Sequence, residues 1–425
     1  MTRVIHTGDT HIGYRQYHSP VRRQDFLEAF RSVVRDAVEA DVDAVVHAGD
    51  LFNDRRPDLQ DLLGTISILE ELRAADIPFL AVVGNHEDMR SGQWLDLFER
   101  LDLAVHLHER GTVVGETTFY GLDYVPRSKR DRLEYDFTPP ETAHAALVSH
   151  GLFSPFPHGD WDLEEVLDRS TVDFDAVLLG DDHTPETKRV AGAWATYCGS
   201  TERTSAAERD PRGYNLVTFQ GDEEVSITRK GLDTRDFVFI DVELRDEEGP
   251  ARIRERIREA SVDDAVVIVT VEGEGGSITP ADIEQFGNEQ GALVTRVNDR
   301  RERGEEGEIE VSFADPDRAV RERVQEEGFS EAALAIDGVV RDGEVADSNV
   351  RDQVKAAVED LLEEEDASFR PAENQPPKDA ERSDDEALED EGEEGGDGQG
   401  DAAVADETER EPADRGQATT MEDFL

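Results

Sequence analysis

The stretch LLGDDHTP, residues 178–185, decides the fold class of this chain. Its two leucines close an apolar run, and Gly180 then turns the chain. The three residues from Asp181 to His183 follow at once, and Pro185 prevents a helix from starting there. A buried strand that ends in polar and charged side chains predicts a ligand site at the mouth of a sheet rather than more core.

The same form recurs along the first half of the chain. Apolar segments that begin as strands and end in polar loops occupy residues 4–11, 43–50, 78–86, 145–151 and 175–183. Residues 22–40 and 59–75, which lie between the first three of these segments, have the apolar spacing of helices. Alternating strands and helices predict a layered α/β fold, in which ligand sites collect at strand ends. The residues just past the strands are Asp9, His11, Asp50, Asn85, His86, His150, Asp181 and His183.

These strand-end residues suggest metal chemistry. Carboxylates, an amide and imidazoles without a thiolate suit manganese, iron or zinc better than copper. The set is too large for one ion with an open position, and Asp50 could bridge two ions. Two ions about 3.5–4 Å apart can clamp both oxygens of a phosphate ester under attack. Each short motif taken alone is also ordinary turn chemistry, so the prediction depends on their order along the chain.

Composition limits the other classes of function. The 425 residues include 101 acidic and 45 basic ones, which gives a formal net charge of −56. Such a surface either repels anions or belongs to a cell with molar internal salt, where the Debye length is about 3 Å. We favour the halophilic interpretation. Under it, the lack of a basic patch does not argue against nucleic-acid binding. The single cysteine and the absence of an apolar run of about 20 residues predict a cytoplasmic protein without a membrane span.

The chain is predicted to have several parts. A main α/β domain (1–232) precedes a small α/β domain (233–300) and a charged linker (301–315). Residues 316–366 carry an amphipathic helical pattern. Residues 367–416 have too few large apolar side chains to fold and are predicted to be disordered. The last residues (417–425) form a short apolar peptide.

The order D-x-H, GD, GNH, H and G-x-x-H resembles the calcineurin-like metallophosphoesterases. The segments THIGYRQYHSPVRRQDF (10–26), GDLFNDRRP (49–57), GNHE (84–87) and GSTERTS (199–205) are similar to the double-strand-break repair nucleases of the meiotic-recombination-eleven/SbcD family. This resemblance implies a layered β-sandwich core flanked by helices and a DNA-facing capping domain at 233–300. It also implies a manganese-dependent nuclease that cuts duplex ends and single strands.

The family also implies roles for individual residues. Asp9, His11, Asp50 and His183 would bind one manganese ion, and Asp50, Asn85 and His150 the other. His86 would help to protonate the leaving group. The family usually has histidine where this chain has Asp181, which we expect to substitute as a ligand of the second ion. Asp182 would be solvated or support a ligand.

Other predictions concern partners. Tyr14, Arg15, Gln16 and His18 could face DNA. Arg127, Lys129 and Arg130 form a basic loop that fits a phosphate contact and a solvated loop equally well. The family implies a homodimer and a coiled-coil ATPase of the Rad-fifty/SbcC type, docked on residues 316–366. Met421, Phe424 and Leu425 resemble a peptide that binds the sliding clamp, although glutamine is displaced by one position.

Two other functions remain open on the sequence alone. A phosphatase or small-molecule phosphodiesterase of the same superfamily would act on nucleotides but not on DNA. A scaffold with a nuclease weakened at Asp181 would hold the ATPase on DNA with little cleavage.

Overall fold

The computed structural model describes residues 1–301 except 90–91 and 222–223, together with 336, 354–355 and 358. The predicted linker beyond residue 301, acidic tail and terminal peptide lie outside these described residues, as does the helical segment apart from those isolated positions. In the described part, no helix is long and apolar enough to cross a bilayer.

The first of two large sheets has six strands and carries the N-terminal strand near its centre. Its order is β14 (Glu224–Gly231), β13 (Gly213–Gln220), β1 (Thr2–Thr7), β2 (Ala44–His47), β3 (Phe79–Ala81) and β4 (Val105–His106). The strands β1 to β4 run parallel, whereas β13 lies antiparallel to β1, with Val217 opposite Val4.

The second sheet also has six strands. Its order is β11 (Glu186–Val190), β12 (Ala193–Tyr197), β10 (Ala176–Gly180), β7 (His144–His150), β6 (Thr117–Leu122) and β5 (Thr112–Val114). The two short strands β8 (Phe153–Ser154) and β9 (Trp161–Asp162) pair with each other in the loop after β7.

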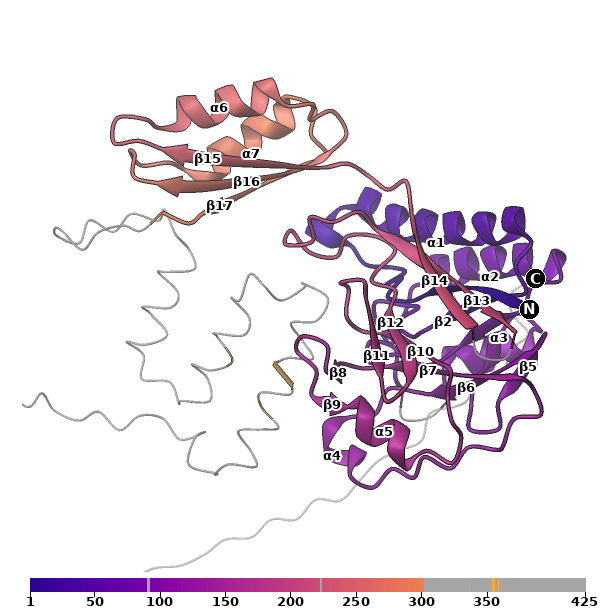
Figure 1. Cartoon of the computed structure of the whole chain (residues 1–425). Helices are drawn as coiled ribbons and strands as arrows, with labels where there is room; N and C mark the ends of the chain where they lie inside the picture. Colours follow the sequence, from indigo (N-terminus) through magenta and orange to yellow (C-terminus); the bar gives the residue numbers. More distant parts are fainter. Residues whose placement is uncertain (90–91, 222–223, 302–335, 337–353, 356–357, 359–425) are drawn as a thin grey trace, which may run out of the picture. The chain divides into compact units, whose positions relative to one another are not determined.

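The two sheets pack face to face, and helices cover their outer faces (Figure 1). Val46 and Leu80 of the first sheet meet Val148 and Leu178 of the second in the central core. The helices α1 (Pro20–Ala40), α2 (Leu59–Ala74) and α3 (Trp94–Arg100) cover the first sheet, and α5 (Leu163–Arg169) covers the second. The short elements η1 (Gln16–His18) and α4 (Arg127–Arg130) lie in loops.

This arrangement explains the apolar runs. In β10, Leu178 enters the core between the sheets, while Val177 and Leu179 pack on the α5 side. Because both faces of the strand are buried, the sequence is continuously apolar instead of alternating. The predicted α/β fold class with a layered β-sandwich core is confirmed.

A smaller parallel sheet follows, with the order β15 (Phe237–Leu244), β16 (Val266–Gly273) and β17 (Val294–Asp299). The helices α6 (Pro250–Glu259) and α7 (Pro280–Glu289) connect its strands. Ile253 and Ile283 pack from these helices onto Val267 and Val269 of the central strand. This three-stranded unit therefore has an apolar core of its own.

Candidate metal centre

The loops that follow β1 and β2 run side by side at the carboxyl ends of the parallel strands. The Asp9 amide donates a hydrogen bond to the carbonyl of Gly49 (3.0 Å), and the His11 amide donates to the carbonyl of Asp50 (3.1 Å). Because neighbouring parallel strands end at the same edge, residues far apart in sequence share one site.

The backbone at the site is held in a conformation that few residues adopt. Four site residues have positive φ: Asp9 (50°), His11 (42°), Asp50 (57°) and Asp181 (97°). Aspartate tolerates this left-handed region better than most residues, and such strain is concentrated at functional sites. Gly84 has a different reason to be glycine, since a Cβ atom there would lie 2.1 Å from Oδ1 of Asp50.

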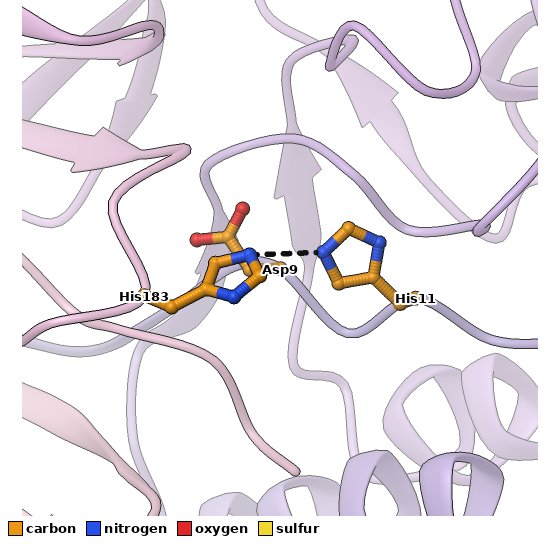
Figure 2. A group of neighbouring side chains, drawn as sticks. All are labelled: Asp9, His11 and His183. Atoms are coloured by element: carbon orange, nitrogen blue, oxygen red, sulfur yellow. Dashed lines mark hydrogen bonds between the residues drawn. The ribbon is translucent and has the colours of Figure 1, made fainter. Parts of the chain in front are cut away.

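The first cluster contains Asp9, His11 and His183, all buried (Figure 2). The Nε2 atoms of the two histidines face each other at 3.1 Å. The carboxylate of Asp9 lies beside them, and its oxygens accept the amide N–H of Asp181 at 3.0 and 3.2 Å. One carboxylate and two imidazoles directed at one point form a donor set that suits a divalent transition metal.

The second cluster surrounds His150, at the end of β7. Its Nε2 lies 2.8 Å from Oδ1 of Asn85, 3.5 Å from Oδ2 of Asp50 and 3.8 Å from Oδ1 of Asp181. Nδ1 of His150 donates to the carbonyl of Ala48 at 2.8 Å, which leaves the lone pair on Nε2 when the ring is neutral. The side chain of Asp181 is 12% exposed and faces this cluster.

Asp50 lies between the two clusters. Its Oδ2 is 3.9 Å from Nε2 of His11 and 3.5 Å from Nε2 of His150. Oδ1 accepts the amide N–H of His86 at 3.0 Å. One carboxylate oxygen that faces donors on both sides is the arrangement expected of a bridging ligand.

His86 is nearly buried, and its ring contacts that of His11 edge to face. Nδ1 donates to the carbonyl of Asn53 at 3.0 Å, and Nε2 lies 3.9 Å from Oδ2 of Asp50. The geometry therefore presents Nε2 of His86 to the site. His11, Asp50 and His86 also form a group compact enough to hold an ion, so geometry alone allows His86 either role.

The charges of the site favour bound cations. Burial raises the pKa of Asp9 to about 7 and that of Asp181 to about 6. Burial acts to lower the pKa of His150, but attraction to Asp50, Asp181 and Asp9 outweighs it and raises the pKa to about 9. A divalent cation would relieve the repulsion among these carboxylates and take the place of the protons. The residues present thus fit a pair of divalent ions.

The predicted DNA contacts differ in their surroundings. Gln16 is fully buried, and its Oε1 accepts a hydrogen bond from Nε of the buried Arg22 at 3.0 Å. The expectation that Gln16 faces DNA is therefore corrected: its amide holds Arg22 in the fold. Tyr14 is partly buried against Phe26, whereas Arg15 and His18 are exposed.

The three basic residues of the loop at 127–130 also differ in their surroundings. Arg130 packs its guanidinium over the Trp161 ring, 4.6 Å from the centroid, and donates to Asp160 at 2.7 Å. Arg127 and Lys129 are exposed. The fold therefore uses Arg130, while the side chains of the other two residues reach solvent.

Two carboxylates that support the site were not predicted from the sequence. Glu87 is buried and accepts the amide N–H groups of Phe52 (3.1 Å) and Gly84 (3.3 Å), so it ties the loops after β2 and β3 together. Glu208 lies 2.9 Å from Nδ1 of His183. Glu87 comes directly after the strand-end residue His86, whereas Glu208 lies in a loop. The available signals were the motif GNHE, which contains Glu87, and the motif GSTERTS, which ends three residues before Glu208.

Comparison with known proteins is consistent with this site. Residues 2–185 match the Calcineurin-like phosphoesterase family. A DNA double-strand break repair protein Mre11 from Haloferax volcanii is 60% identical over 386 residues, which are 90% of this chain and 87% of that protein. The protein of the same name from Halobacterium salinarum is 58% identical over 86% of this chain and 96% of its own length. That from Methanosarcina acetivorans is 44% identical over 87% of this chain and 62% of its own length.

Proposed function

The chain belongs to the Mre11 family of DNA double-strand break repair nucleases, and we propose that it hydrolyses DNA at breaks with two manganese ions. The observation that carries this proposal is the convergence of carboxylates, an amide and imidazoles from separate strand ends on one buried site. The halophilic sources of the two most similar relatives named above agree with a chain of net charge −56.

We assign the ligands by proximity. Asp9, His11 and His183 would hold one ion, and Asn85, His150 and Asp181 the other, with Asp50 shared. When bound, such a pair polarises a phosphodiester and activates water for attack. The carboxylate of Asp181 would take the place of the histidine that the family usually has there, and it adds negative charge to the second metal position. In a manganese-bound crystal structure, an Asp181 oxygen should lie about 2.0–2.3 Å from an ion.

We propose that His86 donates a proton to the leaving oxygen. Its Nδ1–H is engaged by the Asn53 carbonyl, so Nε2 is the atom that exchanges a proton with substrate. Asn85, the residue before His86, faces His150. Asn85 would therefore bind metal, and His86 would transfer the proton.

The test is cleavage of duplex ends and single strands with manganese in molar KCl. His86→Ala should keep both ions and lose roughly 10²–10⁴-fold in turnover, the usual contribution of a general acid. His108→Ala, at an exposed histidine, is the matched control. If the metal content of His86→Ala falls in step with its activity, His86 is a ligand instead. Turnover of nucleotides without cleavage of DNA would identify a phosphodiesterase, and DNA binding without cleavage a scaffold.

We also propose the division of labour along the chain and its partners. Residues 1–232 would be the nuclease, 233–300 would contact DNA, and 316–366 would bind a coiled-coil ATPase of the Rad-fifty/SbcC type. Met421, Phe424 and Leu425 would bind the sliding clamp, and two copies of the chain would form a homodimer. A chain that ends at residue 301 should no longer co-purify with the ATPase. A peptide of residues 417–425 with Phe424→Ala should lose the heat of binding to the clamp.

A further inference from the structure

The Nδ1 atom of His183, which faces away from the metal site, has a partner that no other histidine of the site has. Nε2 faces His11, and Nδ1 points away toward the loop that contains GSTERTS. There it lies 2.9 Å from Oε1 of Glu208 and 2.8 Å from Oγ1 of Thr204. The side chains of His183 and Glu208 are only 7% and 12% exposed, so this contact is largely shielded from water.

Glu208 is itself fixed by several donors. Oε1 accepts the hydroxyl proton of Thr204 at 2.8 Å, and Oε2 accepts the Thr204 amide at 3.0 Å and Nη1 of Arg212 at 3.1 Å. Arg212 also donates to the carbonyl of His183 at 3.1 Å and to Oγ of Ser200 at 3.2 Å. Since the Thr204 hydroxyl gives its only proton to Glu208, Nδ1 of His183 must be the donor in this group.

Two of the other site histidines, His150 and His86, have weaker acceptors on Nδ1, and Nδ1 of His11 has no hydrogen-bond partner among the described residues. Nδ1 of His150 donates to the carbonyl of Ala48, and Nδ1 of His86 donates to the carbonyl of Asn53. A carboxylate behind an imidazole fixes the tautomer with its lone pair on Nε2 and makes that nitrogen a stronger donor to a metal than a carbonyl does.

We propose that Glu208 is a positioning residue that orients His183 and strengthens one metal position of the pair, that of Asp9, His11 and His183. This proposal rests on the proposed metal ligands but not on the activity toward DNA. It gives the GSTERTS loop a function: Thr204 donates to the carboxylate that supports the ligand, and Ser200 accepts a hydrogen bond from Arg212, which also donates to that carboxylate. The alternative is that Glu208 only keeps this loop folded.

Manganese titration of the full chain in molar KCl, followed by the EPR signal of the free ion, tests the proposal. Glu208→Gln should lower the affinity for one of the two ions by roughly 10–100-fold, which is the usual effect of losing such a partner. The affinity for the other ion should stay within about twofold of the wild type. His183→Ala identifies the affected position. In the His183→Ala background, Glu208→Gln should have no further effect on that ion, because the two residues act through one contact.

Two controls separate positioning from folding. Glu186→Gln changes a more exposed glutamate on β11 and should leave both affinities unchanged. Arg212→Lys disturbs the same loop while keeping the carboxylate beside His183. The proposal is overturned if the Glu208→Gln variant binds both ions with wild-type affinity. It is also overturned if the variant loses affinity for both ions equally and loses stability, and Arg212→Lys shows the same two losses. A wild-type chain that binds both ions as expected but cleaves no DNA would refute the proposed function and leave this inference intact.

Discussion

Two histidines that carry no assigned chemistry lie in the adjacent strands β1 and β2. His6 and His47 are fully buried, and burial lowers the pKa of each to about 3. The unfolded chain binds a proton on each below about pH 6.5, whereas the folded chain does not until about pH 3. The free energy of unfolding therefore falls as the pH drops through this window, by up to about 1.4 kcal/mol per pH unit for each histidine.

Replacing one of them should flatten that dependence. His6→Leu removes the titrating group at similar volume, so its unfolding free energy should fall about 1.4 kcal/mol less per pH unit than that of the wild type. Urea unfolding between pH 6 and 4.5 in molar KCl measures the difference. His108→Leu, at an exposed position, should keep the wild-type slope. Identical slopes for His6→Leu and the wild type would show that His6 is not held neutral.

At the scale of single residues, the sequence indicated the side chains that point into the site better than the residues that hold those side chains in place. The residues that converge on the site follow apolar runs, so strand ends marked them in advance. Glu208 could not be distinguished in this way, because it is one of 101 acidic residues and lies in a loop. Gln16 was misassigned because its partner, Arg22, is itself buried, which an arginine rarely is.

At the scale of elements, the apolar runs predicted β1, β2, β3, β7 and β10, because burial on both faces leaves a continuous apolar signature. The order of the strands was not predictable in this way. The pairing of β13 beside β1 joins residues more than 200 positions apart, and nothing local in either strand specifies its neighbour. The short strands β8 and β9 lack enough residues to show any period.

The helix α2 exposes more apolar surface than its covering role requires. Leu59 and Leu63, one helical turn apart, are 69% and 56% exposed. We propose that they form the contact between two copies of the chain. Leu63→Glu should convert a dimer to a monomer at micromolar concentration, because it would bury a charge in the contact. Light scattering measures the mass.

The control is Val113→Glu, since Val113 on β5 is exposed to a similar degree, 59%. It should leave the mass unchanged. A wild-type chain that is already monomeric, or a Leu63→Glu variant that stays dimeric, would rule out this face of α2 as the contact.

At the scale of the whole molecule, charge should control stability. The net charge of −56 repels itself over a Debye length of about 10 Å in 0.1 M salt but only about 3 Å in 1 M salt. Lowering KCl from 2 M to 0.1 M should therefore cost several kcal/mol of unfolding free energy, a fall in Tm on the order of 10 °C. Thermal melts followed by circular dichroism measure it. Glycine betaine, a neutral osmolyte, should not replace the salt if screening is the cause. Full recovery in betaine, or a Tm independent of salt, would mean that repulsion among the acidic side chains does not limit the stability of this fold.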